Sequence, residues 1–189
     1  SQSGARGILL FNQGRFVEAR ETLEPLADQG RAGSLELAVL GLCYVELEEH
    51  GKAETVLLRA RRLDPTSSLV QIGLGTLSFQ RGEFQAAYEH FDLARRIEPE
   101  SLQARRGAAA SLTNLGILQY REGHSGRARE SLEEALRLQP DEGFQLAIQV
   151  KEPGDTAGVK VVPLSFDYAD AFGTLPTAYE TLLLDVLLG

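Results

Sequence analysis

The chain has 189 residues, 43% of them hydrophobic and 24% charged, which is the composition of an ordinary globular protein of one or two small domains. A formal net charge of −8 argues against a general nucleic-acid-binding protein, which would normally be basic. No run of about 18 apolar residues is present to span a membrane, and the single cysteine, Cys43, excludes an internal disulfide. We expect a cytoplasmic protein; the start SQSGARG, in a chain without methionine, is equally consistent with a processed product that has lost a leader.

The first 140 residues read as helices that come in pairs. The predicted pairs cover residues 4–33, 34–67, 68–101 and 102–140. The first pair turns at Asn12 to Arg15, and Pro25 is expected to kink or shorten its second helix. We place the turn of the second pair at Glu48 to Gly51 and that of the fourth at Glu122 to Gly126.

The third pair, GTLSFQRGEFQAAYEHFDLARRIEP, shows the repeated pattern most clearly. Gly82 lies in its turn, and one face of its second helix carries Phe84, Ala87, Phe91 and Ala94. The set Gly75, Ala87, Ala94 and Pro99 recurs 34 residues earlier as Gly41, Ala53, Ala60 and Pro65. It recurs 41 residues later as Gly116, Ala128, Ala135 and Pro140. One further step back, the pattern continues at Gly7 and Ala19.

The repeated small residues predict close packing between helices. Glycine inside a helix costs roughly 1 kcal/mol relative to alanine, so a glycine that recurs there indicates close helix approach. The space between pairs is then filled by Leu57, Phe91 and Leu132. Seven extra residues, about Leu102 to Ala108, equal nearly two turns and contain no proline. We predict that they lengthen the first helix of the fourth repeat at its start; a longer loop is the alternative.

A period of 34 with small residues at these places and a terminal proline resembles the tetratricopeptide repeat. The large aromatic residue usual near the start of the first helix is replaced by Leu37, Gln71 and Leu112. The resemblance implies an all-α, right-handed superhelical solenoid of four hairpins over residues 1–140. It also implies a non-catalytic scaffold that binds a protein or peptide, because the first helices of such repeats line a concave groove.

By the phase of the repeats, thirteen positions face that groove. They are Leu42, Val45, Glu46, Leu69, Ile72, Thr76, Phe79, Gln80, Thr113, Asn114, Ile117, Tyr120 and Arg121. Some proteins of this family hold a peptide carboxylate there, but only Asn114 and Arg121 could serve that purpose. The mostly apolar lining favours a helical or extended peptide. The alternative is a groove covered by the leucine-rich segment Tyr179 to Leu188, in its own chain or in a neighbour.

After Pro140 the pattern changes, and residues 141–189 predict a short α+β tail. FQLAIQVKEP alternates and is strand-like, and Val159 to Tyr168 reads as a second strand in which Pro163 favours an edge. Pro176 to Leu188 reads as a helix with proline in its first turn.

This tail is similar to the C-terminal sheet region of bacterial glucose-6-phosphate dehydrogenases. The matching residues are Gln139 to Gly143, Lys151, Pro153, Gly154, Tyr168, Phe172, Pro176, Ala178, Tyr179, Glu180, Leu182 to Val186 and Gly189. The resemblance implies a role in subunit contact, and hence a homo-oligomer formed through the tail. The nucleotide-binding half and the stretch with the catalytic histidine have no counterpart in this sequence, so no catalytic residue is assigned. A natural fusion and an engineered chimera both remain open.

The sequence predicts neither an enzyme nor a metal or cofactor site. His50, His90 and His124 are far apart, whereas metal ligands converge and often come in closely spaced pairs. Adjacent carboxylates such as Glu48 and Glu49 do not face each other on a helix, and Cys43 reads as a small buried residue.

Overall fold

The structure is a computed structural model that describes residues 1–138, 144–151 and 159–166. The chain divides into two compact units, Ser1–Leu138 and Gln139–Gly189. The first unit consists of helices, and the described part of the second consists of two strands. Each unit is described by itself.

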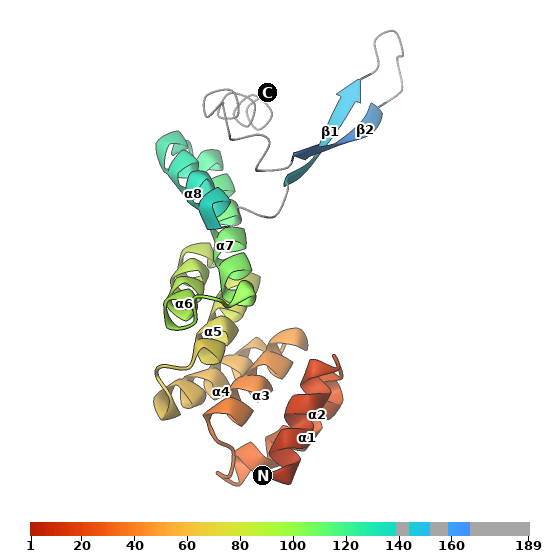
Figure 1. Ribbon diagram of the computed structural model, residues 1–189, viewed down its shortest axis with the longest axis vertical. Helices are drawn as coiled ribbons and strands as arrows, with labels where there is room; N and C mark the ends of the chain where they lie inside the picture. The colour runs from red at the N-terminus through yellow and green to blue at the C-terminus, as the bar shows by residue number, and fades with distance from the viewer. Residues whose placement is uncertain (139–143, 152–158, 167–189) are drawn as a thin grey trace. The chain divides into compact units, whose positions relative to one another are not determined.

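The first unit is a series of four helical hairpins (Figure 1). The first helices of the hairpins are α1 (Gln2–Asn12), α3 (Ser34–Glu46), α5 (Ser68–Gln80) and α7 (Leu102–Arg121). The second helices are α2 (Phe16–Asp28), α4 (His50–Leu63), α6 (Phe84–Ile97) and α8 (Ser125–Leu138). Helix α2 continues through Pro25 to Asp28, so the proline does not end it, and its 13 residues are one fewer than in α4.

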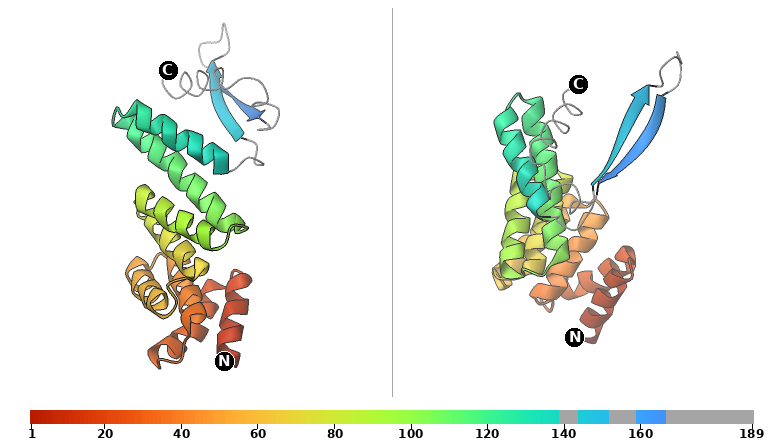
Figure 2. Two further views of the ribbon diagram at one scale, coloured as in Figure 1. Left: turned by 60° about the vertical axis from the view of Figure 1, so that its left-hand side comes forward. Right: turned by 45° about the horizontal axis from the view of Figure 1, so that its top comes forward.

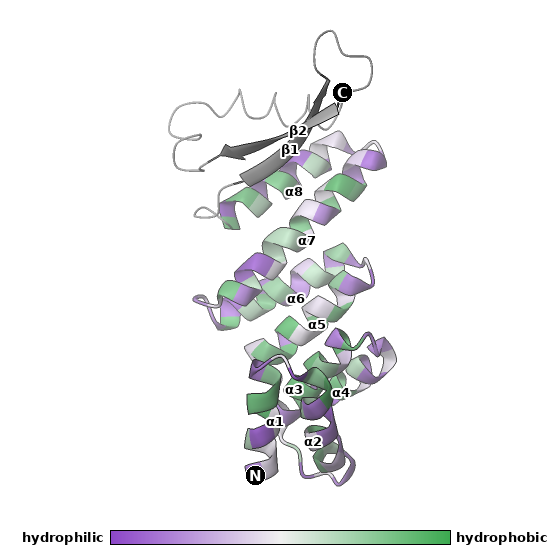
Figure 3. Cartoon of the chain, turned by 90° about the vertical axis from the view of Figure 1, so that its right-hand side faces the viewer, coloured by the Kyte–Doolittle hydropathy of each residue, from purple (hydrophilic) through white to green (hydrophobic). Residues whose placement is uncertain are grey.

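The first helices form a continuous layer, because α1 contacts α3, α3 contacts α5, and α5 contacts α7. Each second helix contacts its own partner and the first helix of the next repeat, as the further views in Figure 2 illustrate. Hydrophobic residues are dense along α3, whereas hydrophilic residues gather at the turns (Figure 3). This is the arrangement of a helical solenoid, in which each hairpin buries its apolar face against its neighbours.

Most of the turns inside the hairpins use a glycine in the left-handed region. Gly14, Gly82 and Gly123 have φ values of 74°, 76° and 81°. The equivalent residue of the second hairpin is Glu48, with a φ of 59°. The expected turn at Glu48 to Gly51 is corrected accordingly, because Gly51 lies inside α4 and Glu48 takes the turn conformation.

The glycines inside the first helices mark close contacts, as predicted. A Cβ atom added to Gly41 would lie 2.5 Å from the side chain of Leu57, and one added to Gly75 would lie 3.1 Å from Phe91. The same two side chains also touch the next repeat. A Cβ on Gly73 would lie 2.6 Å from Leu57, and one on Gly107 would lie 2.5 Å from Phe91. Each large residue is therefore held between two glycine-bearing helices.

Helix α7 has 20 residues where α5 has 13, which confirms the predicted lengthening and excludes the longer loop. The extra turns do not simply precede the repeat, however. The cap residue Ser101 follows Ser67 by 34 residues, and Gly107 follows Gly73 by the same step. Gly116, at the step of 41, lies against Leu132 of α8. The first half of α7 therefore packs in register with the third repeat, and the second half packs with α8.

The core of the first unit contains the predicted small and apolar residues. Ala19, Ala53, Ala87 and Ala128 are all buried, as are Leu57 and Phe91. Leu132 is half-buried. Cys43 is a buried free thiol, in agreement with the sequence interpretation. Within the described residues, no helix is long and apolar enough to cross a membrane.

In the second unit, β1 (Phe144–Lys151) pairs with β2 (Val159–Phe166) in an antiparallel sheet. Phe144 lies opposite Phe166, and Lys151 lies opposite Val159. The helix predicted over Pro176 to Leu188 lies outside the described residues.

Candidate functional site

The predicted groove residues come from three first helices, α3, α5 and α7, but they differ in exposure. Leu42 and Ile72 are each 3% exposed and Val45 is fully buried, so these three side chains belong to the core rather than to an open lining. The sequence phase places them on the first-helix face, and the packing of the next repeat then covers them.

The other ten predicted residues keep accessible surface. Glu46, Gln80 and Arg121 are exposed. The half-buried positions are Leu69, Thr76, Phe79, Thr113, Asn114, Ile117 and Tyr120. The apolar lining therefore lies mainly on α5 and α7.

A pocket of about 560 Å³ opens between α5, α6 and α7. It brings together two predicted residues, Thr76 and Phe79, with six that the sequence reasoning did not assign. These six are Phe91, Leu102, Gln103, Arg106, Gly107 and Ala110. Five of the six come from the first half of α7. The 34-residue step from Gly73 to Gly107 was the signal that could have placed this segment beside α5.

Local contacts fix the walls of the pocket. The ring of Phe79 packs edge-on against Phe84, with 5.4 Å between centroids. The hydroxyl of Thr76 donates to the Ile72 carbonyl oxygen at 2.9 Å. Phe91 is buried against Gly75 and Gly107, so its ring forms a fixed floor. The pocket is therefore preformed by the packing of three helices.

The polar residues farther along α7 are bonded within their own helix. Thr113 Oγ1 donates to the Ala109 carbonyl oxygen, and Asn114 Nδ2 donates to the Ala110 carbonyl oxygen, both at 2.9 Å. Asn114 therefore already uses an amide proton that a peptide carboxylate would need, which weakens the case for a carboxylate clamp.

The charges around the pocket are one-sided. Helices α5 and α7 contain no aspartate or glutamate, whereas α7 carries Arg105, Arg106 and Arg121. The nearest carboxylates in sequence, Glu98 and Glu100, lie in the connection before α7, and Glu98 accepts a hydrogen bond from the Ser68 hydroxyl at 2.6 Å. A positive strip in a chain of net charge −8 favours an acidic ligand.

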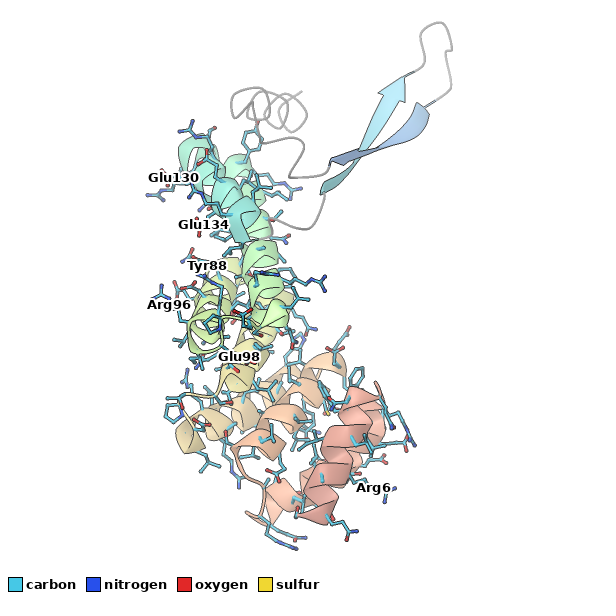
Figure 4. All side chains as sticks on the ribbon, in the orientation of Figure 1. Arg6, Tyr88, Arg96, Glu98, Glu130 and Glu134 are labelled. Carbon is cyan, nitrogen blue, oxygen red and sulfur yellow. The ribbon has the colours of Figure 1, made fainter. Side chains whose placement is uncertain are left out.

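The titratable residues elsewhere make structural contacts. His90 Nδ1 lies 2.9 Å from Gln71 Oε1, and burial lowers the pKa of His90, with Arg61 adding to the effect. Burial raises the pKa of Cys43 to about 12, which disfavours the reactive thiolate. Burial likewise raises the pKa of Tyr88 on α6, with Asp92 and then Glu134 on α8 contributing (Figure 4). No group of three metal-ligating side chains converges among the described residues.

Comparisons with known protein families divide the chain in the same way as its sequence. Two tetratricopeptide repeat models match residues 5–68 and 66–141. The model of the glucose-6-phosphate dehydrogenase C-terminal domain matches residues 117–189, so it overlaps the fourth hairpin.

Similar solved structures are helical repeat proteins. A crystal structure of MamA aligns with 70% of this chain and 74% of its own, at 20% identity and a TM-score of 0.54. YrrB, described as a TPR protein with an unusual peptide-binding site, aligns with 71% of this chain and 66% of its own, at 22% identity and a TM-score of 0.54. The second TPR domain of human RPAP3, solved with an HSP70 peptide, aligns with 58% of this chain and 91% of its own, at 24% identity and a TM-score of 0.50. At these identities the likeness concerns the fold.

Similar curated proteins match about a third of the chain. Glucose-6-phosphate 1-dehydrogenase of Treponema pallidum is 51% identical over 65 residues, which are 33% of this chain and 12% of the enzyme. The enzyme of Aggregatibacter actinomycetemcomitans is 47% identical over 55 residues, 29% of this chain and 11% of the enzyme. The matched segment therefore spans about one-ninth of the length of these relatives. Residues 5–141 of this chain belong to the tetratricopeptide repeat family, and the segment that follows them is similar to the C-terminal domain of glucose-6-phosphate dehydrogenase.

Proposed function

We propose that the helical unit is a non-catalytic scaffold that binds a helical or extended peptide along α5 and α7. The observation that carries this proposal is the preformed pocket on the layer of first helices, with Phe79, Phe91 and Leu102 among its apolar walls. Apolar pockets with a few polar groups at the rim are the usual form of a binding site. The peptide-binding sites named for YrrB and RPAP3 support the same use of the fold.

The test is a selection of random twelve-residue peptides on the full chain, followed by titration of the selected peptides. We expect Phe79→Glu and Tyr120→Glu to weaken binding at least tenfold, which is about 1.4 kcal/mol. Leu9→Glu is the matched control, because Leu9 is an exposed apolar residue on the first helix α1. Circular dichroism verifies that each variant is folded. Failure to select any peptide, or unchanged binding in both groove variants, would contradict the proposal.

A second candidate function is self-association through residues 139–189. Within the described residues, β1 and β2 each pair on one side, and open strand edges are sites where another chain can add. The similarity to a dehydrogenase C-terminal domain supports this candidate. Light scattering on the full chain and on a chain ending at Asp141 tests it. A dimer that becomes a monomer on truncation would identify the tail as the association device; two monomers would reject this function.

A further inference from the structure

The pocket owes one of its walls to the extended form of α7. Leu102, Gln103 and Arg106 stand at its rim on the first turns of that helix, and Ala110 continues the wall. Leu102 is 44% exposed although it is a leucine. The absence of a side chain at Gly107 lets α7 lie directly on the ring of Phe91. The pocket is therefore specific to the junction of the third and fourth repeats.

The size of the pocket limits what it can hold. Ligand pockets for small molecules have volumes of about 300–1,000 Å³, and a volume of about 560 Å³ lies within that range. The phenylalanine rings of Phe79 and Phe91 present apolar and aromatic surface to the interior. An aromatic or leucine side chain, with the adjoining peptide backbone, suits such a space.

The charge next to the pocket selects the neighbours of that side chain. Arg106 lies on the wall itself, and Arg121 lies fifteen residues farther along the same helix, about 22 Å away at 1.5 Å per residue. An extended peptide covers that distance with roughly seven residues. No carboxylate of α5 or α7 competes for these guanidinium groups.

We propose that this pocket binds the bulky apolar side chain of an acidic peptide segment from another protein, with the flanking carboxylates of the peptide directed to Arg106. The inference rests on the proposed function and narrows it to one subsite and one class of peptide. The apolar side chain supplies burial, and the carboxylates supply orientation and faster association.

The experiment uses the full chain and a fluorescein-labelled peptide, EEEFEEE, measured by fluorescence polarisation. Two comparison peptides separate the requirements: EEEAEEE removes the aromatic side chain, and KKKFKKK reverses the charge. We expect saturable binding of EEEFEEE, and at least tenfold weaker binding of both comparison peptides. Equal binding of KKKFKKK and EEEFEEE would overturn the charge requirement and with it the proposal.

Protein variants locate the site. Ala110→Leu places a larger side chain in the pocket, and Arg106→Glu reverses the charge on its wall; each is expected to weaken EEEFEEE binding at least tenfold. The matched controls are Ala5→Leu on the exposed side of α1 and Arg31→Glu in the connection before α3, which should leave binding unchanged. Circular dichroism confirms folding, and the conservative variant Arg106→Lys should retain part of the affinity.

The outcomes distinguish this inference from the broader proposed function. If selected peptides depend on Phe79 but EEEFEEE does not bind, or Ala110→Leu has no effect, the scaffold function stands and this subsite is rejected. If no peptide binds at all, both fail. A synthetic peptide with the sequence of residues 167–189 identifies a different occupant: if it binds more tightly than EEEFEEE and loses binding in Ala110→Leu, a segment of a second copy fills the pocket and the proposed partner is wrong.

Discussion

At the scale of single residues, the turn positions illustrate how one backbone requirement is met by different side chains. Gly14, Gly82 and Gly123 adopt positive φ without penalty because they have no Cβ atom. Glu48 adopts the same region with a φ of 59°, where an L side chain meets the following carbonyl oxygen. The turn of the second hairpin is therefore the strained one among these four.

Replacing Glu48 with glycine should stabilise the protein. Relief of the left-handed strain exceeds the extra chain entropy that glycine loses on folding, so we expect a gain of roughly 0.5 kcal/mol in the free energy of unfolding. Urea denaturation measures it. The reverse change, Gly82→Glu, is the matched control and should destabilise the protein. A stabilising Gly82→Glu or a destabilising Glu48→Gly would show that the backbone conformation is not the limiting factor.

At the scale of elements, α7 joins two registers in one helix. Its first half lies against Phe91 through Gly107, and its second half lies against Leu132 through Gly116. Seven residues correspond to nearly two helical turns, so the same face of the helix returns to the core after the insertion. The helix can therefore pack against the third repeat and against α8 without a kink being required.

Gly107→Ala tests the first of these contacts. The added Cβ would lie 2.5 Å from ring atoms of the buried Phe91, and we expect a loss of about 1–3 kcal/mol from overpacking. Gly126→Ala in α8 is the control, because no atom lies within 4 Å of its added Cβ and alanine favours a helix. The double variant Gly107→Ala, Phe91→Leu should recover part of the loss. Equal stability of the two single alanine variants would refute close packing at Gly107.

At the scale of the whole helical unit, polar contacts join successive repeats in addition to the apolar core. Arg20 of α2 donates to Glu49 at 2.9 Å, and Arg81 after α5 donates to Glu54 of α4 at 2.8 Å. Arg59 of α4 donates to the Ala27 carbonyl oxygen at 2.9 Å. These contacts fix how one hairpin lies on the next, while their exposed carboxylates limit the energy that each supplies.

The stability of the solenoid should fall in acid partly through Glu54. The hydrogen bond and charge of Arg81 lower the pKa of Glu54, so its contribution is complete above the unfolded value of about 4.3 and is lost as the pH falls through the folded pKa. We expect Glu54→Gln to lower the melting temperature near pH 7 and to have little effect near pH 3. The exposed Glu100→Gln is the control. A difference between wild type and Glu54→Gln that persists at about pH 3 would contradict this assignment.

The repeat pattern predicted most of the fold because each repeat imposes the same local requirements. The steps between Gly41, Gly75 and Gly116 identified the helices, their pairing and the lengthened α7 from residue types alone. The steric demand of a close helix contact admits only small side chains, and such a demand is visible in one sequence. The affected positions were therefore predictable without coordinates.

The exposure of the groove and the place of the pocket depended on tertiary packing. Leu42, Val45 and Ile72 share a phase with the groove residues, yet the neighbouring repeat covers them. The pocket arises where α7 begins in one register and ends in another, which brings Arg106 and Ala110 beside Phe79. Sequence by itself determined which residues face the layer of first helices, because helical phase is a local property. Only the tertiary structure decided which of them remain accessible, because accessibility depends on how far one repeat is displaced along the next.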